Sequence, residues 1–283
     1  MNPVSIQARD LPDAWFQFVY QILSEGREYR IDHGSYPGQK RLEFDYITAH
    51  IKHPGVRPLI PDIPPSRGIP DPVQEGYIEE YMPYLMTSEK QPNEDYTYGE
   101  RLAGWVHHVP VREGEFDGDL KKRADEAGLV LCKKHNVNQM ERVCERYQKQ
   151  GYGSNQEAMV VAIPSDINLG DSPCLRHIDT RIDGPKGKER FHFVIYFRSW
   201  DLWNGFPANL GGLQLMKEYM ASEIGVEDGE IIASSKGLHL YDYVWEIAEQ
   251  RTDQIGILEK RGIIREAKEE DMFPEATLEE KVE

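Results

Sequence analysis

Apolar residues recur at helical spacing in five stretches of the chain. In residues 11–26 they share one face, Asp10 can cap the N-terminus of this helix, and Gly26 can end it. The same spacing predicts four further helices, at residues 73–86, 137–150, 209–225 and 241–250. The helix at residues 137–150 carries many charged residues, so we expect it to lie at the surface.

Strands are predicted where apolar residues alternate with polar ones or run without interruption. These stretches are residues 41–50, 158–163, 174–182, 190–198 and 230–233. The uninterrupted run at residues 158–163 indicates a buried strand. A glycine-containing turn at residues 183–188 makes its two neighbouring strands an antiparallel hairpin. This pairing places Cys174 and Arg198 side by side.

The order of these elements limits the fold class. Residues 26–40 and 54–72 show no periodicity and are expected to be loops. Strands and helices do not alternate regularly, and neither GxGxxG nor GxxxxGK[ST] occurs. We therefore predict an α+β fold in which helices pack on a mixed sheet. Residues 1–264 are expected to form a single domain, followed by an acidic tail at residues 265–283.

Composition narrows the function classes. The formal net charge of −16 argues against sequence-independent nucleic-acid binding, which needs clustered Lys and Arg. No apolar run reaches the length of a membrane span, so no membrane partner is expected. Three widely spaced cysteines predict neither a disulfide framework nor a metal site. Reduced thiols and the absence of a signal-peptide pattern at the N-terminus suggest a cytoplasmic protein.

Residues 198–209 carry the densest candidate chemistry. Arg198 and Ser199 follow a predicted strand, Asp201 comes next, and Asn209 begins a predicted helix. A cation, a hydroxyl and free backbone N–H groups converge at such a corner, which suits an anionic ligand. Asn209 both donates and accepts hydrogen bonds, as recognition of an imide or amide edge requires.

Three other segments carry chemistry that this corner lacks. Cys174 is the candidate nucleophile, because the neighbouring Arg198 favours a thiolate. Glu80, like Glu79 before it, offers a general acid or base. His239 and Tyr241 lie two apart on an extended segment, so both project to one side and suit a sugar hydroxyl. Each residue taken alone has a structural explanation, such as a buried cysteine, a salt-bridge arginine or a solvated glutamate.

Four motifs together resemble a known family. They occur in order at residues 172–174, 196–201, 205–209 and 238–241, and they look like the catalytic half of thymidylate synthase and of its pyrimidine hydroxymethylase relatives. Three weaker matches are similar to further parts of that family. They assign Glu80 to its glutamate helix, Tyr98 to its Tyr-Gly segment and Arg30 to its phosphate loop.

The resemblance implies a reaction on a pyrimidine nucleoside monophosphate, with dUMP favoured. Cys174 would add to C6 of the base, and C5 would then attack the one-carbon unit of 5,10-methylenetetrahydrofolate, a co-substrate, with no metal. Asn209 would read the uracil edge, because cytosine-specific relatives commonly carry aspartate there. Glu80 would organise water and proton transfer with Tyr98 beside it.

The resemblance also implies how the rest of the nucleotide and the folate are held. Arg198, Ser199 and Arg30 would bind the phosphate. His239 and Tyr241 would bind the deoxyribose hydroxyl, and Asp201 would contact or orient the pterin end of the folate. By the same resemblance, two subunits form a homodimer in which sheet packs on sheet.

The chain departs from the family pattern in three places. The arginine pair expected before the cysteine, which reaches the partner subunit's phosphate, is missing from residues 154–160. Either Arg142, Arg146 or Arg176 replaces it, or phosphate binding is weaker or different. The parts that shield the reductive step are missing or not recognisable. The strand after Cys174 is also unusually polar, and Arg176, His177 and Asp179 belong either to the site or to a subunit contact.

These departures leave the product open. Methylation of dUMP to dTMP is the leading interpretation. The alternatives are 5-hydroxymethylation of dUMP, dCMP or CMP, and a nucleotide-binding homologue without turnover.

Overall fold

A six-stranded mixed sheet forms the centre of the protein in the computed structural model, which describes residues 1, 3–33, 36–112, 114–115 and 118–264. The strands lie in the order β1-β4-β11-β9-β8-β7. β1 is parallel to β4 and β11 is parallel to β9, whereas the other neighbouring pairs are antiparallel. Their bounds are β1 Pro3–Ala8, β4 Tyr46–Ile51, β11 Glu227–Ser235, β9 Arg190–Phe197, β8 Leu175–Asp183 and β7 Ala158–Val160.

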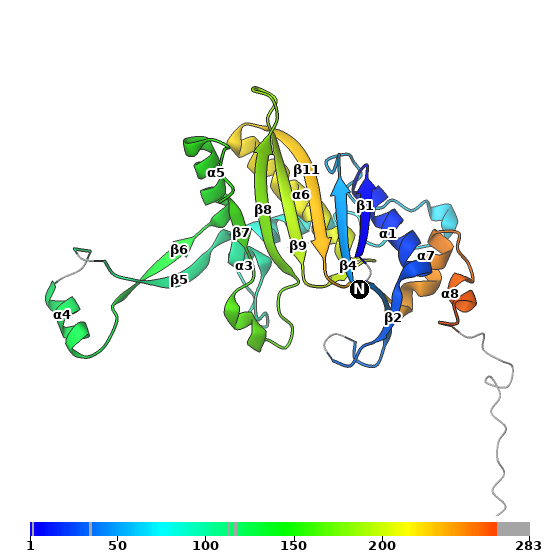
Figure 1. The fold of residues 1–283 in the computed structure, drawn as a ribbon, viewed down its shortest axis with the longest axis horizontal. Coiled ribbons are helices and arrows are strands. Elements are labelled where there is room, and N and C mark those ends of the chain that lie inside the picture. The colour runs from blue at the N-terminus through cyan, green and yellow to red at the C-terminus, as the bar shows by residue number, and fades with distance from the viewer. Residues whose placement is uncertain (2, 34–35, 113, 116–117, 265–283) are drawn as a thin grey trace, which may run out of the picture.

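Helices pack on one face of this sheet, as Figure 1 shows. The main helices are α1 Leu11–Glu25, α2 Tyr77–Met86, α5 Gln139–Gln150, α6 Gly205–Ile224 and α7 Trp245–Arg251. Shorter ones are α3 Tyr98–Ala103, α4 Gly118–Glu126, α8 Ile257–Lys260 and the 3₁₀ turns η1 Pro65–Arg67, η2 Pro164–Asn168 and η3 Asp242–Val244. Helix α6 lies against β9 and β11, and α1 packs beside it through an edge-on contact of Phe18 with Phe206. The α+β prediction, with helices on a mixed sheet, is confirmed.

The opposite face of the six-stranded sheet carries half-buried and exposed side chains. Residues along each strand alternate between the buried face and this one, as expected for a sheet with one face on the core. Its central members are Thr48, His50, Val194, Tyr196, Ile232 and Ser234. We call this surface the open sheet face.

A second, four-stranded sheet carries four of the residues singled out from the sequence, Arg30, Asp201, His239 and Tyr241. Its order is β10-β12-β3-β2, with bounds β10 Trp200–Asp201, β12 Leu238–Tyr241, β3 Lys40–Phe44 and β2 Arg27–Arg30. β12 pairs antiparallel with β3, so His239 lies opposite Glu43 and Tyr241 lies opposite Arg41. Directly opposed residues project to the same face of a sheet.

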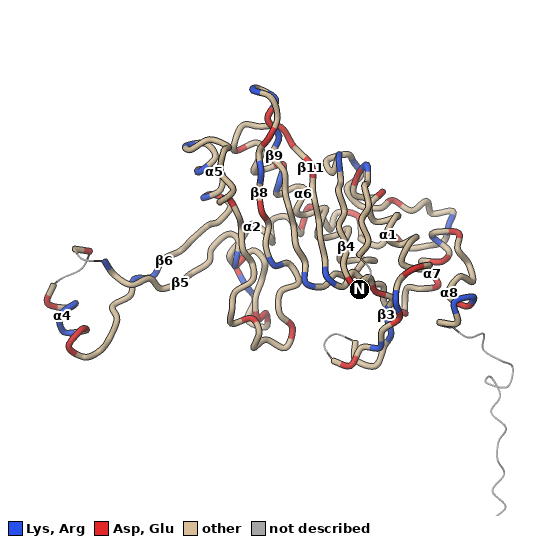
Figure 2. Tube along the Cα trace, viewed as in Figure 1, with Lys and Arg blue, Asp and Glu red and all other residues tan. Residues whose placement is uncertain are grey.

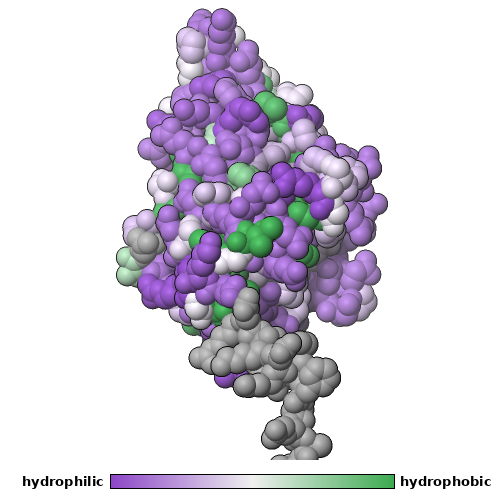
Figure 3. Space-filling view, turned by 90° about the vertical axis from the view of Figure 1, so that its right-hand side faces the viewer, coloured by the Kyte–Doolittle hydropathy of each residue, from purple (hydrophilic) through white to green (hydrophobic). Residues whose placement is uncertain are grey.

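A two-stranded arm extends away from the body (Figure 1). It consists of β5 Trp105–Pro110 paired with β6 Cys132–Val137, and α4 lies at its far end. Acidic and basic residues are mixed along the whole described chain rather than separated into regions (Figure 2). The face on the right of Figure 1 is largely hydrophilic, with small separate apolar patches (Figure 3). None of the described helices is long and apolar enough to cross a membrane.

Three predicted elements differ from the observed ones. The strand expected at residues 41–50 is two strands in different sheets, because the chain turns at Asp45, which accepts a hydrogen bond from Arg27 of β2. β2 itself lies within residues 26–40, predicted to be a loop. The buried strand expected at residues 158–163 is the short edge strand β7, whose Ala158 and Val160 are exposed.

The helix predicted at residues 209–225 also begins earlier than expected. α6 starts at Gly205 rather than Asn209, because the carboxylate of Asp201 accepts hydrogen bonds from the backbone N–H groups of Trp203, Asn204 and Gly205. A carboxylate at this position satisfies donors that have no partner within the helix. Asn209 therefore lies in the second turn of α6 and not at its N-terminus.

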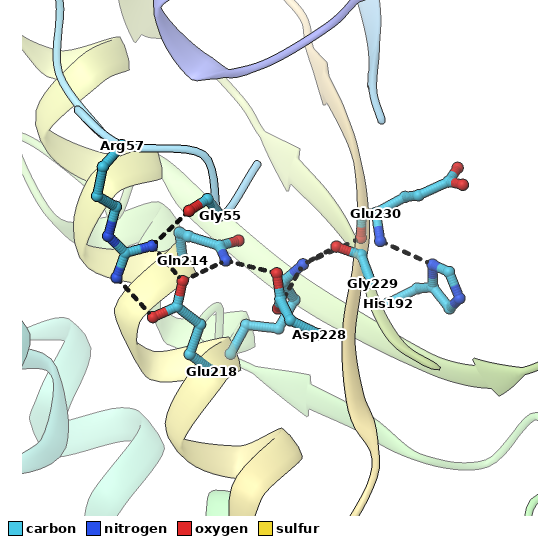
Figure 4. A network of polar contacts seen from close by, with 9 residues as sticks. Gly55, Arg57, His192, Gln214, Glu218, Asp228, Gly229 and Glu230 are labelled. Atoms are coloured by element: carbon cyan, nitrogen blue, oxygen red, sulfur yellow. Dashed lines mark hydrogen bonds and ion pairs between the residues drawn. The ribbon is translucent and has the colours of Figure 1, made fainter. Parts of the chain in front are cut away.

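A polar network fixes the other half of α6 against β11. Gln214 donates to Glu218 and to Asp228, and Arg57 forms an ion pair with Glu218 (Figure 4). The fully buried Lys217 donates to the carbonyl of Gly229 and forms an ion pair with Asp228 at 3.1 Å. These contacts hold α6 in register with β11 of the six-stranded sheet.

Candidate active site

One pocket gathers most of the residues that the sequence singled out. Cys174, Arg198, Ser199, Asp201, His239 and Tyr241 all line it. The other lining residues are His33, Arg41, Glu43, Leu169, Gly170, Asp171, Ser172, Lys236 and Gly237. We call this space the Cys174 pocket. Its walls come from the end of the β8–β9 hairpin and from one face of the four-stranded sheet.

The hairpin brings Cys174 and Arg198 together, as predicted. The backbone N–H of Arg198 donates to the carbonyl of Cys174 at 2.8 Å. The guanidinium of Arg198 donates to the carbonyl of Ser172 and forms an ion pair with Asp171 at 2.7 Å. Burial raises the pKa of the Cys174 thiol; Arg198 opposes this effect, and Asp171 adds to it. Arg176 also lowers this pKa, and the balance of burial and the three charged residues sets how much thiolate is present.

His239 lines the pocket and has a ring nitrogen, Nε2, that is buried and unpaired. Its side chain is 4% exposed, and Nδ1 lies 2.9 Å from the carbonyl of Gly237, so Nδ1 carries the proton. Among the described residues, no group forms a hydrogen bond with Nε2. Burial lowers the pKa of His239 to about 4, which keeps the ring neutral near pH 7. The ring of Tyr241 lies edge-on at 4.7 Å, so the two side chains share one side of β12, as predicted.

Asn209 is held by two aromatic residues. Its Oδ1 accepts from Trp200 Nε1 at 3.0 Å, and its Nδ2 donates to the hydroxyl of Tyr81 at 3.0 Å. Asn209 is not among the residues that line the Cys174 pocket. Tyr81 reaches it because α2 approaches α6 over Gly211 and Gly212, where side chains would collide with α2. Sequence reasoning missed Tyr81, although it lies next to Glu80.

Tyr98 contacts the backbone of Leu175, the residue that follows Cys174. Its hydroxyl accepts a hydrogen bond from the backbone N–H of Leu175 at 3.2 Å. Burial raises the pKa of Tyr98 far above its usual range, so the phenol stays protonated. The hydroxyl of Thr97 caps α3 by accepting from the N–H of Glu100, which sets the position of Tyr98.

Like Asn209 and Tyr98, two further predicted site residues do not line the Cys174 pocket. Glu80 is exposed on α2, and Arg30 is exposed at the end of β2. Asp201 lines the pocket, but its carboxylate also caps α6, and burial raises its pKa.

The candidates for the missing arginine pair lie elsewhere. Arg142 and Arg146 of α5 pair with Glu145 and Glu157. Arg176 donates to the carbonyl of Pro173 and lines a shallow depression on the open sheet face.

That depression also contains His177 and Asp179, whose ring and carboxylate lie 3.8 Å apart. His177 stacks on Tyr196. The polar residues of β8 therefore belong to the open sheet face and not to the Cys174 pocket.

The pocket residues that were not singled out from the sequence include four charged ones: Arg41, Glu43, Asp171 and Lys236. The alternation of Arg41 and Glu43 along one strand was visible. The sequence does not show which strand pairs with this one. Only the pairing of β3 with β12 puts these two side chains beside His239 and Tyr241.

Comparison with known proteins identifies the family. The thymidylate synthase family model matches residues 84–271. A protein of Methanosarcina mazei and one of Methanococcoides burtonii, both provisionally named thymidylate synthases, are 28% identical over 244 and 247 residues. These alignments cover 86% and 87% of this chain and 92% and 93% of those proteins. The thymidylate synthase of Saccharomyces cerevisiae is 26% identical over 144 residues, 48% of this chain and 47% of its own length. This chain belongs to the thymidylate synthase family.

Proposed function

We propose that the protein transfers a one-carbon unit to C5 of a pyrimidine nucleoside monophosphate, converting dUMP to dTMP. The observation that carries this proposal is the contact of Cys174 with Arg198 in a pocket that is also lined by His239, whose buried Nε2 has no partner among the described residues. A nucleophile, a cation for the phosphate and an acceptor for a sugar hydroxyl are the three groups that the reaction requires at one nucleotide.

In the proposed mechanism, the thiolate of Cys174 forms a bond to C6 of the base, and the electron pair of the C5–C6 double bond moves toward C5 and the C4 carbonyl. C5 then acts as the nucleophile toward the one-carbon unit. Loss of the proton from C5 and cleavage of the bond between the one-carbon unit and the folate nitrogen would leave an exocyclic methylene on C5. When bound, the folate would also supply the hydride that reduces this methylene to a methyl group, and it would leave as dihydrofolate. Release of the thiolate from C6 in that step restores the C5–C6 double bond. Arg198 favours the thiolate at the start and holds the phosphate together with Ser199.

Recognition of base and sugar is assigned to groups on α6 and β12. Asn209 reads the uracil edge, and its two aromatic contacts support this role by fixing the orientation of the amide. Nε2 of neutral His239 accepts from the sugar hydroxyl, and Tyr241 lies beside it. Glu80 stays the proposed group for water and proton transfer, with Tyr98 beside the cysteine. Arg30 stays a proposed phosphate contact.

Methylenetetrahydrofolate supplies the transferred carbon when bound. Asp201 is the proposed contact for its pterin end. The three N–H groups that Asp201 caps use three of the roughly four acceptor sites of a carboxylate, so about one remains for a pterin donor at the pocket wall. Asp201 therefore fits the co-substrate as an acceptor for one donor of the pterin.

The family resemblance also supports a homodimer, for which we propose the open sheet face as the contact. Its half-buried Val194 and exposed Ile232 form the apolar part of that surface.

Product analysis tests the proposed reaction. The protein is incubated with dUMP and methylenetetrahydrofolate, and the nucleotide is examined by mass spectrometry while dihydrofolate is followed by absorbance. We expect a methyl product and an equal amount of dihydrofolate. A hydroxymethyl product without dihydrofolate would instead show a hydroxymethyltransferase. If no pyrimidine nucleotide gives either product, the proposal is wrong.

A further inference from the structure

Three cationic side chains line the Cys174 pocket. Besides Arg198, the pocket is lined by Arg41 of β3 and by Lys236 of the turn between β11 and β12. Neither Arg41 nor Lys236 has a part in the proposed function described so far. Both come from segments that the hairpin of Cys174 does not include.

Backbone pairing fixes where these two cations lie. Arg41 stands opposite Tyr241 in the β3–β12 ladder, so the two side chains share one face. The backbone N–H of Lys236 donates to the carbonyl of Phe197 at 3.2 Å, which places Lys236 beside the strand end that carries Arg198. Gly237 then turns the chain into β12 with φ +75°, a conformation that side chains other than glycine rarely adopt.

The donors of these cations are only partly used. Arg41 forms an ion pair with Glu43 at 2.7 Å, but its buried Nε has no hydrogen-bond partner among the described residues. Lys236 is exposed, and its ammonium forms no ion pair within the described part of the chain. A phosphate monoester offers three acceptor oxygens, which match donors that converge from several directions.

Two carboxylates oppose the binding of an anion here. Asp171 is exposed and pairs with Arg198, and Glu43 is largely buried and pairs with Arg41. Burial raises the pKa of Glu43, so this group takes up a proton more readily than an exposed glutamate when a phosphate dianion arrives. Asp171 lies at the surface and is free to turn toward water.

We propose that Arg41 and Lys236 complete the phosphate site with Arg198 and Ser199, so that a nucleoside 5′-monophosphate is held by cations of a single chain. This inference rests on the proposed function. It also accounts for the sequence at residues 154–160, where the family's arginine pair for the partner subunit is missing.

Calorimetric titration with dUMP and with 2′-deoxyuridine tests the inference, because only the first carries a phosphate. We expect Arg41→Gln and Lys236→Met each to weaken dUMP binding about 10-fold or more, as for loss of a hydrogen bond to a charged group, and to leave deoxyuridine binding unchanged. Lys149→Met, which removes an exposed lysine of α5, is the matched control and should bind dUMP as the unmodified protein does.

A second variant guards against a folding defect. Arg41→Gln leaves the largely buried carboxylate of Glu43 without its partner, whereas Arg41→Gln with Glu43→Gln removes both charges. The double variant should fold and should still bind dUMP weakly. Unchanged dUMP affinity in a folded variant overturns the inference and leaves the proposed function standing. Equal loss of dUMP and deoxyuridine binding also overturns it. If the unmodified protein binds no pyrimidine nucleotide, the proposed function fails as well.

Mixing two chains that each lack one of the two groups tests the single-chain part of the inference, at a dUMP concentration too low to saturate the Arg41→Gln chain. Cys174→Ala and Arg41→Gln chains are co-expressed with different tags, and an assembly that contains both chains is purified through the two tags. If the two chains do not assemble, they are purified separately and assayed as a mixture. We expect no restored release of tritium from 5-tritiated dUMP, because neither chain has both groups. Restored release would mean that Arg41 acts across an interface, which contradicts the inference.

Discussion

Asp171 and Arg198 form an ion pair of 2.7 Å at the mouth of the Cys174 pocket. Both residues act on the thiol: Asp171 raises the pKa of Cys174, and Arg198 lowers it. The same arginine is the proposed ligand of the phosphate. Asp171 therefore competes with the nucleotide for Arg198 and also holds back formation of the thiolate.

Removing either charge should change the reactivity of Cys174 in opposite directions. We predict that Asp171→Asn lowers the pH midpoint of alkylation of Cys174 by iodoacetamide and that Arg198→Gln raises it. Mass spectrometry of the peptide that contains Cys174 separates it from the exposed Cys132. Asp179→Asn, on the open sheet face, is the control. Unchanged midpoints in both variants would contradict this account of the thiol.

The buried His239 should make folding sensitive to acid. Its folded pKa of about 4 lies below the usual value of about 6.5, so between these values the unfolded chain binds a proton that the folded protein does not. Stability is therefore lost as the pH falls from about 6.5 toward 4. Between pH 7.5 and 4.5 this group should account for about 2–3 kcal/mol of the free energy of unfolding.

His239→Asn removes that dependence, while its amide can still donate to Gly237. Urea unfolding at the two pH values should show that the variant loses about 2–3 kcal/mol less than the unmodified protein. His53→Asn changes an exposed histidine and serves as the control. Equal losses in the unmodified protein and in His239→Asn would rule out this assignment.

The close approach of α2 to α6 should be needed for Asn209. A methyl group at Gly212 would lie 2.4 Å from the ring of Tyr81, whose hydroxyl accepts from Asn209. We predict that Gly212→Ala costs about 1–3 kcal/mol of stability and weakens dUMP binding, because the ring must move. Gly153→Ala has open space around it and should change neither quantity. Wild-type stability and binding in Gly212→Ala would show that this contact does not position Asn209.

The open sheet face should hold two copies together. We predict that Ile232→Glu, which puts a charge on this face, yields a monomer in size-exclusion chromatography with light scattering. Ile255→Glu changes an exposed residue near α7 and should leave the oligomeric state unchanged. If the unmodified protein is a monomer, or if Ile232→Glu still forms a dimer, the face has another role.

Local patterns predicted the main elements where one physical signal dominated. Asp10, the apolar face and Gly26 predicted α1 to within a residue, and the turn at residues 183–188 predicted the pairing of β8 with β9. The contact of Cys174 with Arg198 follows from that hairpin alone. The family, too, was inferred from four ordered motifs and is confirmed by the family match.

Contacts between distant segments could not be predicted in this way. Tyr81 bonds Asn209 across 128 positions of sequence, and Arg41 reaches the pocket only through pairing of β3 with β12. The predicted start of α6 was wrong because the carboxylate that caps the helix belongs to Asp201, four residues before Gly205. The prediction placed the start next to the apolar pattern instead. The predicted tail at residues 265–283 lies outside the described residues.

Release of tritium from 5-tritiated dUMP tests the central claim most directly, because the C5 proton exchanges only after addition at C6. With methylenetetrahydrofolate present, we predict release by the unmodified protein and none above background by Cys174→Ser, while Cys132→Ser keeps full release. Undiminished release by Cys174→Ser, or none by the unmodified protein, would contradict addition of Cys174 to the base.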